Sequence, residues 1–206
     1  MEVIRQWIIE GRLPPGSPLV ESRLAAELNV SRVPVREALQ RLSEQGLVDL
    51  RPGQSAQVAR RNARDVVELL EIREVLEGLA ATSAAAKRTV DDITALDAVI
   101  QQADALIDAG DWAAVGHLNV DFHRTVTAIA RNDHLASLIE GFRFQLAWLN
   151  TASAEARGRD AWLEHAELLQ AIVAQDARRA EQVARRHTRL SREAFVKALL
   201  DGTIKA

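Results

Sequence analysis

The stretch Leu24–Leu50, LAAELNVSRVPVREALQRLSEQGLVDL, constrains the fold of this chain more than any other part of it. It reads as a short helix, a tight turn, a second helix and the start of a strand. Arginines follow the second helix on the side that faces away from its apolar residues. This layout is typical of a helix-turn-helix, which places its second helix in a DNA groove. The sequence therefore predicts a DNA-binding element near the N-terminus.

The turn chemistry inside this stretch supports that interpretation. Asn29 falls where the turn needs a positive φ, a conformation that asparagine tolerates better than most non-glycine residues. Ser31 is suited to begin the second helix, and Pro34 falls in its first turn, where a missing N–H costs nothing. Arg32 and Arg36 then face outward, toward base edges or phosphates.

Two short apolar segments after this helix predict a β-hairpin. They are Leu47–Leu50 and Ser55–Ala59, on either side of the tight turn RPGQ. Gly53 at the tip lets the backbone come close to a phosphate or a minor groove. We interpret the hairpin as the wing of a winged helix-turn-helix and assign residues 1–60 to this DNA-binding domain.

From about residue 65 onward the strand signal ends and long amphipathic segments follow, which predict helices joined by short connections. The predicted helices are 65–87, 91–109, 111–131, 133–150, 160–175 and 176–200, with a mobile loop at 151–159. Short connections favour an antiparallel bundle. The predicted fold class is therefore mainly α, with an N-terminal winged helix-turn-helix and a C-terminal antiparallel all-α bundle over residues 65–206.

Composition excludes several classes of protein. Cysteine is absent, so disulfides, thiolate metal sites and a cysteine nucleophile are ruled out. No run of 18 apolar residues occurs, and the N-terminus lacks the apolar core of a signal peptide. We therefore expect no membrane partner and a cytoplasmic location.

Helical phase sorts the five histidines. His123, His165 and His187 each fall on or beside the apolar stripe of a different helix, whereas His117 faces the opposite way and His134 lies near a helix start. A single inward histidine is usually a satisfied core residue. Three inward imidazoles are harder to satisfy, because each buried ring nitrogen needs a partner. A shared divalent metal ion would satisfy all three.

A fourth ligand candidate lies one turn before the first of these histidines. Asn119 precedes His123 by four residues, so both side chains lie on one face of their helix. Asp121 carries more charge but is rotated by roughly 200° from His123. We therefore predict a site for zinc, nickel or manganese formed by Asn119, His123, His165 and His187.

No catalytic constellation accompanies this set. The chain has no HExxH and no GxSxG motif, and no inward carboxylate is an evident general base. The glutamates at 68, 71, 74 and 77 are expected to form a solvated helix face with some inward exceptions. Arg73 lies among apolar residues and is either a structural ion pair with an acid or a carboxylate clamp for a small ligand. We predict that the chain is not an enzyme. A metal-dependent enzyme and a metal-free regulator of acyl or other apolar ligands remain the alternatives.

Both halves resemble one known family. In the first half the resemblance to the GntR superfamily of winged-helix repressors lies in Gly11–Gly16, Leu24-Ala25, VSRVPVREAL at 30–39 and Gly46–Val48. In the second half the resemblance is to the FadR branch with its FCD-type ligand domain, at Ile72-Arg73, Leu76-Glu77, Phe122-His123, Asn132 and the 22-residue spacing from His165 to His187.

The first half of the resemblance implies a transcription regulator, here expected to be a repressor, that binds a palindromic operator in double-stranded DNA as a homodimer. It implies DNA contacts from Ser31, Arg32, Val33, Arg36 and the wing around Gly53. A frequently basic position of the family holds Ser22 in this sequence, which removes one expected contact to DNA.

The second half implies control by a small effector, commonly a carboxylate-bearing metabolite, which Arg73 would bind. In metal-containing members the ligands are an Asp or Asn and three histidines, and these fall on Asn119, His123, His165 and His187. Asn119 stands where other members have Asp, so this site holds one negative charge fewer.

Overall fold

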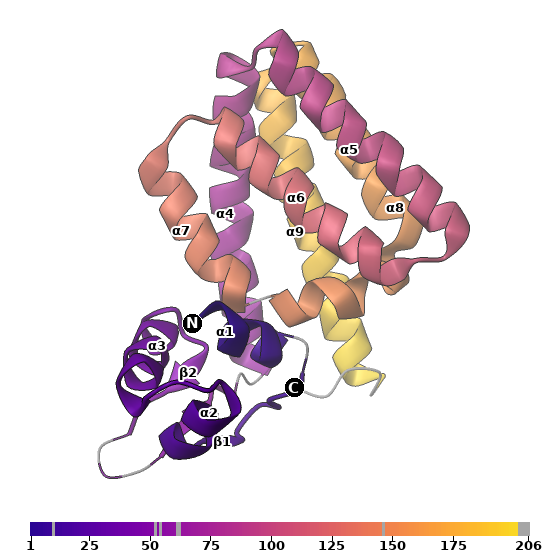
Figure 1. Cartoon of the computed structure of the whole chain (residues 1–206). Helices are drawn as coiled ribbons and strands as arrows, with labels where there is room; N and C mark the ends of the chain where they lie inside the picture. The colour runs from indigo at the N-terminus through magenta and orange to yellow at the C-terminus, as the bar shows by residue number, and fades with distance from the viewer. Residues whose placement is uncertain (10, 52, 54, 61–62, 146, 202–206) are drawn as a thin grey trace. The chain divides into compact units, whose positions relative to one another are not determined.

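The computed structural model describes residues 1–9, 11–51, 53, 55–60, 63–145 and 147–201. The chain divides into two compact units, one built mostly from Met1–Asn62 and the other mostly from Ala63–Phe142 and Leu149–Lys205 (Figure 1). No helix in the described ranges combines the length and the apolar character needed to cross a bilayer.

The first unit combines short helices with a small antiparallel sheet. Its elements are α1 (Glu2–Ile9), β1 (Pro18–Leu19), α2 (Glu21–Glu27), α3 (Arg32–Glu44), β2 (Val48–Asp49) and β3 (Ala56–Val58). The strands lie in the order β1-β3-β2, with Leu19 opposite Ala56 and Val48 opposite Val58. The predicted hairpin pairs β2 with β3. Strand β1 was not predicted, because two residues are too few to show an alternating pattern.

The turn between α2 and α3 has the predicted geometry. Asn29 adopts φ +52°, and the N–H of Val30 donates to the carbonyl of Ala25 at 3.0 Å. Ser31 occupies the N-cap position of α3, although its side chain makes no capping hydrogen bond. Gly46, at φ +71°, ends the helix. Helices α1 to α3 and the sheet enclose one apolar core, which includes Ile4, Leu19, Leu24, Val35, Leu39, Leu42, Val48 and Val58.

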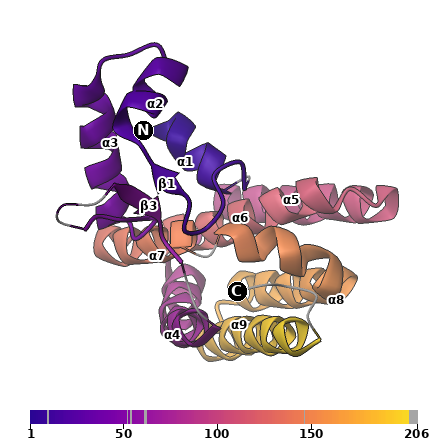
Figure 2. The same cartoon turned by 90° about the horizontal axis from the view of Figure 1, so that it is seen from below.

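The second unit is an all-helical bundle. Its elements are α4 (Ala63–Lys87), α5 (Val90–Ala109), α6 (Trp112–Ile129), α7 (Asp133–Gln145), α8 (Ala147–Val173) and α9 (Ala177–Leu200). Helices α4 and α9 run side by side, as Figure 1 and the end-on view of Figure 2 both show. The predicted fold class, a winged helix-turn-helix followed by a helical bundle, is confirmed.

Local capping explains several of the bundle's helix boundaries. Thr89 and Asp92 form a reciprocal capping box at the start of α5, and Gly110 ends that helix in the left-handed conformation. The Asp111 carboxylate then accepts from the N–H of Ala114 at the start of α6, as predicted. Asp176 plays the same part before α9.

The prediction of a loop at 151–159 is wrong. The backbone from Ala147 to Val173 forms α8, in which two helical segments meet at a kink at Gly158 (φ +46°, ψ −135°). The second helical segment of α8 begins just after Gly158, close to the helix start predicted at Asp160. The alanines, glutamate and arginine of this stretch favour a helix, and only the glycine can adopt the broken conformation without strain.

Candidate functional site

Three imidazoles from three helices meet in the interior of the bundle. His123 comes from α6, His165 from α8 and His187 from α9, and one ring nitrogen of each lies within 4.8 Å of the others. All three side chains are buried. The Nε2 atoms of His165 and His187 are 3.3 Å apart. Helical phase alone had pointed each of these imidazoles inward, and the tertiary structure brings them together.

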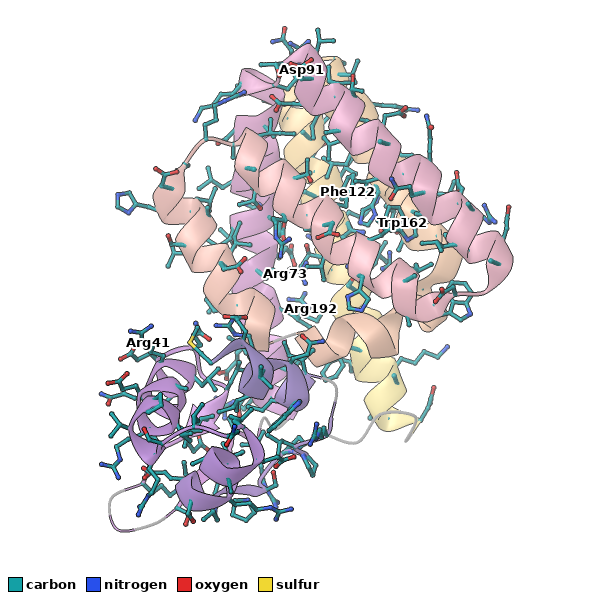
Figure 3. All side chains as sticks on the ribbon, in the orientation of Figure 1. Arg41, Arg73, Asp91, Phe122, Trp162 and Arg192 are labelled. Carbon is teal, nitrogen blue, oxygen red and sulfur yellow. The ribbon has the colours of Figure 1, made fainter. Side chains whose placement is uncertain are left out.

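Aromatic packing holds the central imidazole in place. The His165 ring stacks on Phe122 with centroids 4.2 Å apart and meets the edge of Trp162 at 4.7 Å. Figure 3 shows Phe122 and Trp162 close to each other between the helices of the bundle. Because both aromatic neighbours are buried, the orientation of His165 is set by packing.

A buried carboxylate, Glu77, and a partly buried one, Glu164, orient the other imidazoles. Glu77 Oε2 lies 3.3 Å from Nδ1 of His123, and Glu164 Oε2 lies 2.8 Å from Nδ1 of His187. An ionised carboxylate can only accept, so it favours the tautomer in which Nδ1 carries the proton. Each Nε2 lone pair is then left to face the interior of the cluster, as in carboxylate–histidine–metal arrangements.

The cluster fits a divalent cation on its own geometry. Nε2 of His123 is buried without a hydrogen-bond partner among the described residues, although buried ring nitrogens are normally satisfied, and a bound cation would satisfy it. Nδ1 of His165 also lacks a partner among these residues, but it cannot bind the same ion as Nε2 of its own ring. Two nitrogens bound to one tetrahedral zinc at about 2.0–2.1 Å lie roughly 3.3–3.4 Å apart. The 3.3 Å between His165 and His187 has this value.

Burial keeps the imidazoles of His165 and His187 neutral. Burial lowers the pKa of His187 to about 4, against the weaker opposing effect of Glu164. Burial, together with the charges around it, also lowers the pKa of His165 well below its ordinary range. Both rings are therefore unprotonated near neutral pH, with lone pairs available for a metal ion.

A small cavity of about 50 Å³ adjoins the cluster. Its polar lining includes Arg73, Asn119, Arg157 and Ser191 beside His123 and His187. Asn119 is half-buried and reaches this cavity from α6, one turn before His123. Such a volume holds a few water molecules or the head of a small anion.

Arg73 forms the structural ion pair, one of the two roles that the sequence left open. Its Nε donates to Glu77 Oε1 at 3.1 Å, and Arg73 also lines the cavity. Burial would raise the pKa of Glu77, but the adjacent His123 and Arg73 lower it to about 2. The Glu77 side chain is only 3% exposed. Glu77 is therefore one of the inward exceptions expected on the otherwise solvated glutamate face.

Sequence reasoning missed three residues of this site. Glu77 could have been found, because it lies one turn after the inward Arg73. Arg157 was hidden by the incorrect loop assignment; it lines the cavity and pairs with Glu164. Glu164 had no local signal, because its partner His187 lies on another helix, 23 residues away.

The predicted DNA-contacting residues lie on the surface of the first unit. Ser31, Arg32, Val33 and Arg36 are all exposed at the start of α3, and Val33 is 63% exposed. Gly53, in the wing, adopts φ +74° and has open space where a Cβ would stand. Arg32, Arg36 and Gly53 line one concave surface together with Glu21, Ser22 and Gln40.

Comparison with known proteins places both halves of the chain. Residues 1–58 match "Bacterial regulatory proteins, gntR family", and residues 68–190 match "FCD domain". Some FCD domains bind metal ions. GntR regulators bind DNA and typically dimerise.

Several similar proteins are transcriptional regulators. The chain is 31% identical over 183 residues to the probable D-xylose utilization operon transcriptional repressor of Paenarthrobacter nicotinovorans, covering 87% of this chain and 80% of that protein. It is 30% identical over 210 residues to the Uxu operon transcriptional regulator of Escherichia coli K12, covering 90% and 80%. The solved structure of E. coli McbR/YncC shares the fold, with a TM-score of 0.82 at 23% identity over 96% of this chain and 95% of that one. Members and relatives are regulators and not enzymes, and this chain belongs to the GntR family of bacterial transcriptional regulators, with an FCD domain in its second half.

Proposed function

We propose that this protein is a transcription repressor whose operator binding is controlled by a small carboxylate-bearing metabolite, bound beside a divalent metal ion. In this proposal residues 1–60 bind DNA and residues 65–206 sense the ligand. The observation that carries it is the buried histidine cluster, with two outer carboxylates and an arginine-lined cavity beside it. A purely structural core would not need three converging imidazoles, two of which have a buried ring nitrogen without a partner among the described residues.

The recognition helix α3 would read the operator. Arg32 and Arg36 are exposed guanidinium groups, and arginine pairs bidentately with guanine O6 and N7. Ser31 and Val33 are suited to contacts with the sugar-phosphate backbone and with thymine methyl groups. Gly53 lets the wing backbone approach the duplex.

The metal ion would be held by Asn119, His123, His165 and His187. When bound, a divalent cation supplies a concentrated positive charge that attracts an anionic ligand. Glu77 and Glu164 hold His123 and His187 in orientation. Because Asn119 is neutral, these four residues contribute no negative charge, which favours an anionic effector.

The effector would occupy the cavity and contact Arg73. Only Nε of Arg73 is bonded to Glu77, and a guanidinium has five N–H donors, so its remaining donors are suited to a carboxylate. The cavity of about 50 Å³ is far below the roughly 300–1,000 Å³ of ordinary ligand pockets. That size favours the head of a small acid over an acyl chain.

A homodimer on a palindromic operator fits the surface of the bundle. Ile72, Val75 and Leu79 are each about half exposed and lie at i, i+3 and i+7, so they form an apolar stripe along α4. Control by the effector then requires that it bind one dimer geometry more tightly than another, since only differential affinity shifts an equilibrium.

Metal analysis of protein purified without chelator tests the ligand-sensing part. We expect close to one zinc, nickel or manganese per chain, and a raised melting temperature when the metal is added to stripped protein. His187→Gln should abolish both effects, whereas His134→Gln, on an exposed histidine of the same unit, should not. Wild-type protein with less than about 0.2 metal per chain and no thermal shift would refute the metal site.

Binding to operator and random DNA tests the reading helix. Arg32→Ala should lose about 1–3 kcal/mol of preference for operator while non-specific binding remains. Equal losses on both DNAs would mean that Arg32 contacts only phosphate. A screen of small central-metabolism acids on metal-loaded protein, followed by an operator-release assay, would identify the effector.

A further inference from the structure

A partly buried carboxylate binds both arginines of the recognition helix. Glu21, the first residue of α2, accepts from Arg36 Nε and Arg36 Nη2, each at 2.8 Å, and from Arg32 Nη2 at 3.4 Å. The side chain of Glu21 is 25% exposed, whereas each arginine side chain is 64% exposed. The carboxylate therefore lies behind the arginines and leaves their outer parts in solvent.

The bonding pattern leaves one edge of Arg36 free. A guanidinium carries one N–H on Nε and two on each Nη. Glu21 accepts from Nε and from one hydrogen of Nη2, which together form the side edge of the planar guanidinium group. The end edge, with Nη1 and the second hydrogen of Nη2, has no partner among the described residues. Two parallel donors on such an edge match O6 and N7 of a guanine.

We propose that Glu21 is a specificity-determining residue for DNA, which positions Arg36 so that its free edge faces a guanine and restrains both arginines from moving onto phosphates. This inference rests on the proposed reading of the operator by α3. Two bonds from one carboxylate fix the orientation of the guanidinium plane before DNA binds. A long, solvated arginine side chain without such bonds would lose this conformational freedom on binding, at an entropic cost.

The charge of Glu21 has a second effect. Hydrogen bonds from Arg36, with a smaller contribution from Arg32, lower the pKa of Glu21 to about 2, so the group is ionised at any physiological pH. Glu21, Arg32 and Arg36 together carry a net charge of +1 instead of +2. Non-specific affinity for DNA depends on phosphate neutralisation, so Glu21 lowers binding to random sequence while it favours a chosen base.

The test compares Glu21→Gln with a matched control. Glu27→Gln removes the same charge from the same helix, but Glu27 pairs with Arg12 and lies outside the surface that contains Arg32 and Arg36. The operator would first be defined by in vitro selection with wild-type protein. Affinities for that operator, for single-base variants of each guanine and for random duplex would then be measured by fluorescence anisotropy at two salt concentrations. Arg36→Ala identifies the guanine that Arg36 reads.

We expect Glu21→Gln to lose about tenfold in discrimination at the guanine identified with Arg36 and to bind random DNA more tightly. The slope of its DNA affinity against salt concentration should steepen by the amount that corresponds to about one more phosphate contact. Glu27→Gln should keep wild-type discrimination. Unchanged discrimination in Glu21→Gln, or an equal loss of affinity for operator and random DNA, would overturn the role of Glu21 but not the proposed reading of DNA by α3. A wild-type protein that selects no sequence, or an Arg36→Ala variant that keeps full preference, would overturn the proposed reading of DNA as well.

Discussion

Replacing Glu77 with glutamine should strongly destabilise the bundle. The Glu77 carboxylate is 3% exposed and accepts from Arg73 and His123. Its pKa lies at about 2, against an ordinary value of 4.5. A depressed pKa means that the ionised form contributes stability above about pH 4.5 and that this stability is lost as pH falls through about 2. Near neutral pH the full contribution is present.

The size of the effect follows from two independent arguments. A shift from 4.5 to about 2 corresponds to roughly 3 kcal/mol at about 1.4 kcal/mol per unit. Removing one partner of a buried ion pair costs about 3–5 kcal/mol in other proteins, because the remaining charge is left uncompensated. Glutamine keeps one acceptor oxygen, so we expect a loss of about 2–3 kcal/mol for Glu77→Gln.

Urea unfolding of metal-stripped protein, followed by circular dichroism, measures this loss. The midpoint should fall by roughly 1 M with little change in slope. Glu71→Gln provides the control, because Glu71 lies on the same helix with its side chain 59% exposed, where ion pairs contribute about 0–1 kcal/mol. A loss below about 1 kcal/mol for Glu77→Gln would refute the buried pairing deduced for Arg73, Glu77 and His123.

Three further predictions concern the same unit. Asn119→Asp adds a negative ligand and should tighten metal binding about tenfold or more in a chelator competition; unchanged affinity would remove Asn119 from the ligand set. Burial holds the pKa of His187 near 4, below its ordinary 6.5, so stability of the metal-free protein should be full above about pH 6.5 and decline by up to roughly 3 kcal/mol toward pH 4. Urea midpoints of the metal-free wild-type protein that do not change between about pH 6.5 and pH 4 would contradict this prediction. Arg73→Lys keeps the charge beside Glu77 but loses the planar fork, so it should weaken effector binding about tenfold in calorimetry while metal content and operator binding stay unchanged; a loss of operator binding would assign Arg73 a structural role instead.

Local sequence was sufficient wherever the determining interaction lies within one helix or one turn. Asn29 sits in a turn whose φ is set by its immediate neighbours, so its left-handed conformation was predictable. The inward direction of His123, His165 and His187 followed from the 3.6-residue period, which fixes the face of each side chain. The same period failed at 151–159, where small polar residues are equally compatible with a loop and with an exposed helix.

Only the tertiary structure decided which groups on different elements meet. The three imidazoles converge because α6, α8 and α9 pack around Phe122 and Trp162, and no local pattern specifies that packing. The pairing of Glu164 with His187 and of Glu21 with Arg36 likewise joins residues 23 and 15 positions apart. A carboxylate's partner depends on the distance and burial that the fold imposes. The sequence by itself therefore determined the helix-turn-helix and the inward histidines, and the tertiary structure decided the carboxylates that orient them and the arginine that Glu21 positions.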